Sequence, residues 1–107
     1  MVKTELLKII DEYRQELEKK ITVKKIILYG SFAYGQSRKD SDIDLVIISS
    51  DFAKIKPLER LEFLSLATRK NRAPIEALGY TPEEFEQARN HIFLDYIAQK
   101  GSVIYGG

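Results

Sequence analysis

Two acidic residues, Asp42 and Asp44, stand one position apart at the start of an apolar run. In a β-strand, side chains two positions apart point to the same face, about 6–7 Å from each other. Two carboxylates in that position repel each other unless a cation lies between them. Mg²⁺ is the cation that fits, because it prefers hard oxygen ligands and commonly binds through one or two carboxylates plus substrate phosphates. The spacing therefore indicates a magnesium site.

A second motif, Gly30-Ser31, ends an earlier apolar run. Glycine lets the backbone approach a phosphate closely, and serine offers a hydroxyl and an N–H group to it. Arg38 and Lys39 lie between the two motifs. They would neutralise a leaving pyrophosphate, or they belong equally well to a solvated turn. Each motif alone is common in structural turns, but their combination in this order favours a nucleoside triphosphate site. Two Mg²⁺ ions about 3.5–4 Å apart would serve such a site.

Hydrophobic periodicity predicts the elements that position these residues. Apolar residues between positions 6 and 21 recur at helical spacing, which predicts an amphipathic helix packed on a sheet, with Thr4 as its cap. Strands are predicted at 24–29, 42–49 and 73–80, and a short one at 103–105. A second helix is predicted to begin near Pro57, and its apolar residues spread so widely around it that we expect it to be well buried.

The last third of the chain carries clear helix boundaries. Thr81 is predicted as an N-cap, Pro82 as the first helical residue, and Glu84 as the residue that closes a capping box. A final helix is predicted over 92–99, ended by Gly101. Helices and strands that alternate in this way predict one α/β domain over residues 1–107.

Composition narrows the class of protein. The 107 residues are 44% hydrophobic and 31% charged, as expected for one globular domain. Cysteine is absent, which excludes disulfides and thiolate metal sites and makes the cytoplasm the expected location. No signal-peptide pattern or membrane-length apolar run is found. The net charge of +1 argues against binding to extended nucleic acid.

The stretch 28–45, LYGSFAYGQSRKDSDIDL, resembles the signature of the polymerase-β-like nucleotidyltransferase superfamily, and in particular its minimal nucleotidyltransferase (MNT) branch. The resemblance implies a small mixed β-sheet with helices packed mainly on one face. It also implies that Ser31, beside Gly30, binds the phosphates of ATP or another NTP and that Asp42 and Asp44 hold two Mg²⁺ ions. Tyr34 departs from the pattern, because many members of the branch carry arginine there.

The superfamily usually has a third carboxylate on a later strand. The only acid between positions 73 and 81 is Glu76. By resemblance, Glu76 joins Asp42 and Asp44 as a catalytic residue and metal ligand and favours deprotonation of the attacking hydroxyl. Many members have aspartate at this point, so glutamate is a departure. Geometry in such a site is demanding, and the longer side chain puts the rate of the reaction in question.

Small MNT proteins commonly pair with HEPN-domain toxins, for which they are the antitoxins. The resemblance therefore implies a nucleotidyltransferase that moves AMP from ATP to a hydroxyl, such as that of a tyrosine, on a HEPN partner. We expect the acceptor site to be supplied by another chain, because larger members carry a second domain for it. Two alternatives stay open at this stage. One is a non-catalytic antitoxin that covers its partner, and the other is transfer to a small molecule such as an aminoglycoside, in a pocket built by a homodimer.

Overall fold

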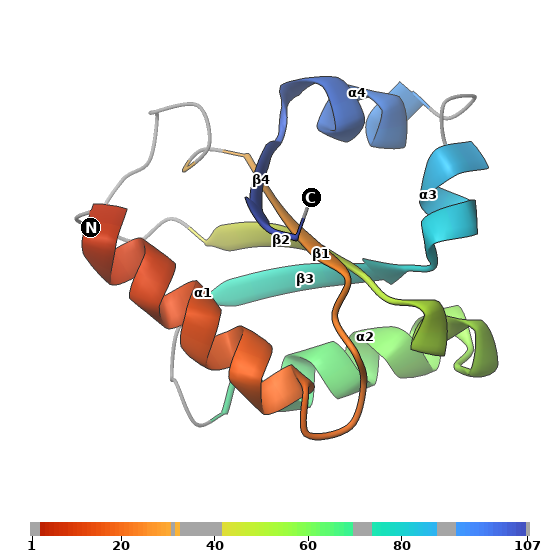
Figure 1. Cartoon of the computed structure of the whole chain (residues 1–107), viewed down its shortest axis with the longest axis horizontal. Helices are drawn as coiled ribbons and strands as arrows, with labels where there is room; N and C mark the ends of the chain where they lie inside the picture. The colour runs from red at the N-terminus through yellow and green to blue at the C-terminus, as the bar shows by residue number, and fades with distance from the viewer. Residues whose placement is uncertain (1–2, 31, 33–41, 70–73, 88–91, 107) are drawn as a thin grey trace.

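The computed structural model describes residues 3–30, 32, 42–69, 74–87 and 92–106. Helices and strands alternate along the chain in the predicted order (Figure 1). The elements are α1 (Lys3–Leu17), β1 (Lys25–Tyr29), β2 (Ile43–Ile48), the 3₁₀-helix η1 (Ser50–Lys54), α2 (Pro57–Leu66), β3 (Ile75–Tyr80), α3 (Pro82–Gln87), α4 (Ile92–Lys100) and β4 (Ser102–Tyr105).

The four strands form one mixed sheet in the order β3-β2-β1-β4. Strand β1 pairs antiparallel with both β2 and β4, whereas β2 and β3 are parallel. A parallel pair needs a crossover connection, and here η1 and α2 provide it. The prediction of a small mixed sheet is confirmed.

Side chains of β2 alternate between two cores. Ile43, Leu45 and Ile47 face the larger core, which contains the buried side of α1 and Leu64 of α2. Val46 belongs to a smaller core with residues of α4. Figure 1 shows the same division, with α1 and α2 on one side of the sheet and α3 and α4 on the other. The larger core, with α1 and α2, lies on one face of the sheet, as expected. Helix α4 packs on the opposite face, over the smaller core.

Two details of the predicted helices were wrong. Thr4 lies inside the first turn of α1, which begins at Lys3, so it is not the N-cap. Helix α2 is not well buried, because only Arg60 and Leu64 are buried and Leu58 is 80% exposed. The helix packs beside β3, the edge strand of the sheet, and therefore has protein on one side only.

The predicted capping box at α3 is confirmed. The Glu84 backbone N–H donates to Thr81 Oγ1 over 3.1 Å, and the Thr81 backbone N–H donates to Glu84 Oε1 over 2.8 Å. Glu84 also accepts hydrogen bonds from Arg60 of α2, with Nη1 to Oε1 at 2.7 Å. The carboxylate therefore caps α3 and ties it to α2 at the same time.

Glu84→Gln should make the stability of the protein less sensitive to acid. Hydrogen bonds from Arg60 hold the pKa of Glu84 below its ordinary value of 4.5. The ionised carboxylate thus contributes stability above about pH 4.5, and this contribution is lost as the pH falls through the lower folded-state pKa. Glutamine keeps the capping oxygen but not the charge. Urea midpoints of the wild type and of Glu84→Gln should differ most near about pH 7 and converge in acid.

The matched control is Glu86→Gln, which removes an exposed charge from the same helix. Its urea midpoint should run parallel to that of the wild type across the same pH range. A constant gap between the wild type and Glu84→Gln down to strong acid would contradict the assignment.

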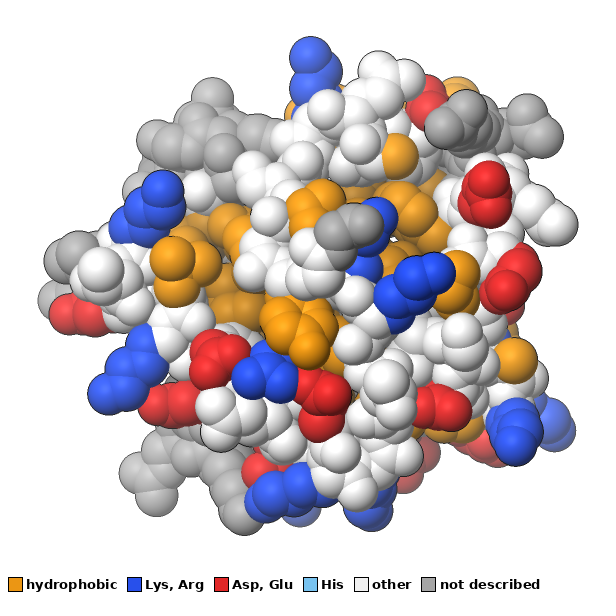
Figure 2. Space-filling model, in the orientation of Figure 1, with side chains coloured by type: hydrophobic (Ala, Val, Ile, Leu, Met, Phe, Trp, Pro, Cys, Tyr) orange, Lys and Arg blue, Asp and Glu red, His pale blue; other side chains and the backbone are white. Residues whose placement is uncertain are grey.

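The molecular surface beside α1 combines a charged band with an apolar hollow. Figure 2 shows acidic and basic side chains along α1 and hydrophobic ones between α1 and β4. A cavity of about 250 Å³ lies there, lined among others by Leu7, Ile104 and Tyr105. The Arg14 guanidinium covers the Tyr105 ring at 4.7 Å from its centroid. None of the helices in the described part of the chain has the length and apolar character that crossing a membrane requires.

Candidate active site

Strand register brings two of the predicted catalytic acids side by side. Asp44 pairs with Glu76 across the parallel β2–β3 ladder, and with Tyr29 across the antiparallel β1–β2 ladder. Directly paired residues of neighbouring strands project from the same face of a sheet. Glu76 and Asp44 therefore form a row with Tyr29, although they come from segments far apart in the sequence.

Asp42 lies just before β2 and is exposed to solvent. Its negative charge nevertheless acts on Asp44. Partial burial raises the pKa of Asp44, and the nearby negative charges of Glu76 and Asp42 raise it further. Two neighbouring carboxylates are thus close enough to disfavour the charge of Asp44, which is an arrangement that a bound cation would stabilise.

Gly30 closes the site at the end of β1. Its φ is +76°, a left-handed conformation that glycine adopts without strain. A Cβ atom at this position would lie 2.2 Å from Oδ2 of Asp44. A side chain fits there only if the Asp44 carboxylate moves, so both the turn and the carboxylate against it favour glycine. The other predicted phosphate-binding residues, Ser31, Arg38 and Lys39, lie outside the described residues.

Gly30→Ala should impair the site more than the fold. The left-handed backbone costs alanine about 1 kcal/mol, and the methyl group must also displace the Asp44 carboxylate. We expect a loss of about 1–2 kcal/mol in unfolding free energy and a loss of nucleotidyl transfer of about tenfold or more.

The matched control is Gly106→Ala, in the segment after β4. Gly106 also has a positive φ, +78°, and a Cβ atom added to it would lie 2.1 Å from a backbone oxygen. Urea unfolding and label transfer would be measured on both variants. Equal activity losses for the two would show that strain alone is responsible.

The acids fit a metal ion by their chemistry. Carboxylate oxygens are the protein ligands that Mg²⁺ takes, and substrate phosphates and water usually complete its shell. Among the described residues no three acidic or imidazole side chains already surround one metal position. The structure does not bring Asp42, Asp44 and Glu76 together as a formed metal site, so their role as metal ligands stays a prediction, in which a phosphate-bearing substrate would complete the set.

A cavity of about 330 Å³ opens next to these acids. Glu76 lines it, together with Tyr29 of β1 and Leu61 of α2. The Tyr29 ring meets Phe93 of α4 edge-on, with centroids 5.9 Å apart. Sequence reasoning did not place α4 at this site, because nothing local in the sequence indicates that Phe93 would meet Tyr29.

Comparison with known proteins identifies the family. Residues 10–100 match the family described as "Nucleotidyltransferase domain". The chain belongs to that family. A candidate protein adenylyltransferase of Methanocaldococcus jannaschii is 31% identical over 101 residues, which cover 92% of this chain and 96% of the relative. The predicted resemblance to nucleotidyltransferases is thereby confirmed.

Solved structures share the fold of this nucleotidyltransferase domain. A candidate nucleotidyltransferase from Sulfolobus solfataricus superimposes with a TM-score of 0.71 at 15% identity, over 96% of this chain and 82% of the other. A tri-AMPylated Shewanella oneidensis HEPN toxin in complex with its MNT antitoxin gives a TM-score of 0.52 at 17% identity, over 96% and 72%. The predicted nucleotidyltransferase fold is confirmed.

Proposed function

We propose that this chain is a Mg²⁺-dependent protein adenylyltransferase that moves AMP from ATP to a hydroxyl group of a HEPN-domain partner, and that it acts as the antitoxin. The observation that carries the proposal is the position of Asp44. It lies in register with Glu76, within electrostatic reach of Asp42, and against a glycine turn that leaves no room for a side chain. A binding module without catalysis has no use for such mutually repelling carboxylates.

In the proposed reaction, the oxygen of the acceptor hydroxyl attacks the α-phosphorus of ATP. A new P–O bond forms, the bond between the α-phosphorus and its bridging oxygen breaks, and pyrophosphate leaves. Asp42, Asp44 and Glu76 are the residues that would hold Mg²⁺, which when bound neutralises charge on the phosphates. Glu76 lines the cavity beside the site, and in this proposal it would accept the proton of the hydroxyl. Gly30 allows the backbone to approach the phosphates closely.

The names of similar proteins support the choice of AMP and of the partner. The relative from M. jannaschii is named as a candidate protein adenylyltransferase. The Shewanella complex pairs an AMPylated HEPN toxin with an MNT antitoxin. Transfer to a protein hydroxyl also agrees with the aliphatic residues beside Glu76 in this cavity, Leu61, Ile75 and Leu78, which suit a side chain of a protein better than a polar sugar such as an aminoglycoside.

The experiment is transfer of label from ATP labelled at the α-phosphate. The chain would be incubated with Mg²⁺ and with the HEPN-domain protein encoded by the neighbouring gene, and the label on each protein would be measured. We expect label on the partner, none with ATP labelled at the γ-phosphate, and none after chelation of Mg²⁺. Tight binding of the partner without any transfer would refute the proposal and favour a non-catalytic antitoxin.

A further inference from the structure

The exposed face of β3 forms the floor of a groove that leads to Glu76. A cavity of about 340 Å³ lies over the end of β3, and the cavity of about 330 Å³ that contains Glu76 lies over its beginning. The two share Leu61 and Leu78, so they adjoin. We call them together the β3 groove. Its walls include Pro57 of α2 and Leu94 of α4.

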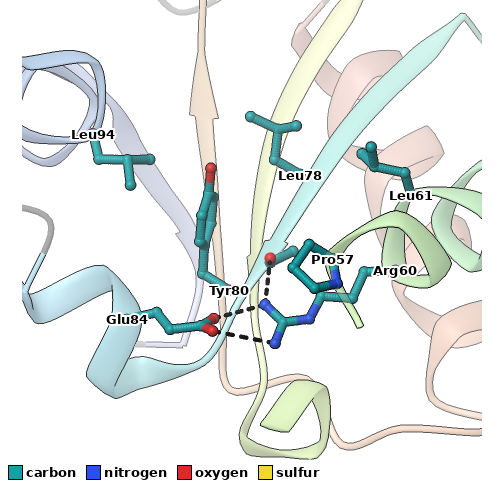
Figure 3. Close-up of a pocket in the computed structure, with 8 residues that line it drawn as sticks. Pro57, Arg60, Leu61, Leu78, Tyr80, Glu84 and Leu94 are labelled. Atoms are coloured by element: carbon teal, nitrogen blue, oxygen red, sulfur yellow. Dashed lines mark hydrogen bonds and ion pairs between the residues drawn. The ribbon is translucent and has the colours of Figure 1, made fainter. Parts of the chain in front are cut away.

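The alternation of β3 gives the groove its direction. Glu76, Leu78 and Tyr80 are spaced by two, so they share one face of the strand. Figure 3 shows Leu78 and Tyr80 rising from β3, with Leu61 and Leu94 approaching from the helices on either side. A ligand that lies along these residues therefore meets the Glu76 carboxylate at one end.

The chemistry of the groove disfavours an anionic ligand that brings no metal ion with it. Its walls are mainly apolar, and the buried Arg60 has its Nε, Nη1 and Nη2 atoms bonded to backbone carbonyls and to Glu84. No donor of this guanidinium is left for a phosphate. The other charged residues that line the groove, Glu76 and Glu84, are both acidic. Their carboxylates are complementary to a cationic partner, and an anion that brings no metal ion, such as an RNA strand, would be repelled.

We infer that the β3 groove binds the acceptor: a polypeptide segment of the partner protein that is apolar, flanked by lysine or arginine, and positioned so that its hydroxyl reaches Glu76. This rests on the proposed function, because it names the docking surface for that reaction. The exposure of Leu61, 44%, supports it, since an apolar side chain that lines a groove so openly gains from being covered.

The test compares two leucines of α2 that differ in position. Leu61 lines the groove, whereas Leu58 is 80% exposed and does not line either cavity. Each would be replaced by lysine, and folding checked by thermal melting. Dissociation constants for the HEPN-domain protein and for Mg²⁺–ATP would be measured separately, along with the KM of the acceptor in the label-transfer assay.

We expect Leu61→Lys to weaken partner binding and raise the acceptor KM by about tenfold or more, with ATP binding changed less than about twofold. Leu58→Lys should change neither constant by more than about twofold. Binding by the wild type should also weaken at high salt.

Equal partner binding by Leu61→Lys and Leu58→Lys overturns the inference. So does binding of a single-stranded RNA oligonucleotide by the wild type that competes with the partner protein. If the wild type binds the partner but transfers no AMP, the proposed function fails, while weaker binding by Leu61→Lys alone still supports the groove as the docking surface. The two failures are therefore distinguishable.

Discussion

Asp44→Asn is expected to lower AMP transfer by about 10³-fold or more while leaving the fold intact. Asp44 is the central acid of the site, because it is paired in register with Glu76 and lies against Gly30. Asparagine has nearly the same shape but supplies neither the second carboxylate oxygen nor the negative charge that a divalent cation needs. The measurement is the initial rate of label transfer to the HEPN-domain partner at saturating Mg²⁺ and ATP.

The stability of this variant provides a second readout. Asp44 is partly buried and repelled by Glu76 and Asp42. Without a divalent cation, removal of its charge should therefore not lower the melting temperature, and it should abolish the stabilisation that Mg²⁺ and ATP give to the wild type. Asp95→Asn is the matched control, because Asp95 of α4 accepts a hydrogen bond from Gln99 and takes no part in the site. Loss of transfer by both variants would refute the role of Asp44.

Local patterns were sufficient to predict most of the fold and to single out Asp42 and Asp44, whereas Glu76 was singled out by family resemblance. The capping box at Thr81 and Glu84 could be predicted because both partners lie within one helical turn. The strand that carries Glu76 was predicted from its composition. Its pairing with the strand of Asp44 was not predicted, because the register of a parallel pair is fixed by packing across the sheet.

The burial of α2 could not be predicted from its sequence. A wide apolar surface on a helix usually indicates burial, yet Leu58 and Leu61 are exposed and the charged Arg60 is buried. Arginine is almost never fully buried unless it is paired, and its partners here come from three other segments of the chain. The identity of those partners depends on the tertiary fold, and a single sequence does not contain it in any local pattern.

Arg60→Met should lower the free energy of unfolding by about 2–4 kcal/mol. The Arg60 side chain is 7% exposed, and its guanidinium joins α2 to the rest of the domain. Nε donates to the Ile55 carbonyl at 2.8 Å and Nη2 to the Phe52 carbonyl at 2.6 Å. Nη1 donates to Glu84 at 2.7 Å and to the Gly79 carbonyl at 3.3 Å. Methionine retains the apolar stem but leaves these acceptors without their donor.

The measurement is urea unfolding of Arg60→Met, with Arg69→Met as the control. Arg69 is an exposed arginine just after α2. The control should change the unfolding free energy by less than about 0.5 kcal/mol.

Glu84→Gln combined with Arg60→Met should lower the unfolding free energy by less than the sum of the two single variants, because both remove the same ion pair. Since Arg60 and Glu84 also line the β3 groove, the double variant should weaken partner binding even under conditions in which it remains folded. Additive losses of stability would instead show that Arg60 acts through the backbone carbonyls and not through Glu84.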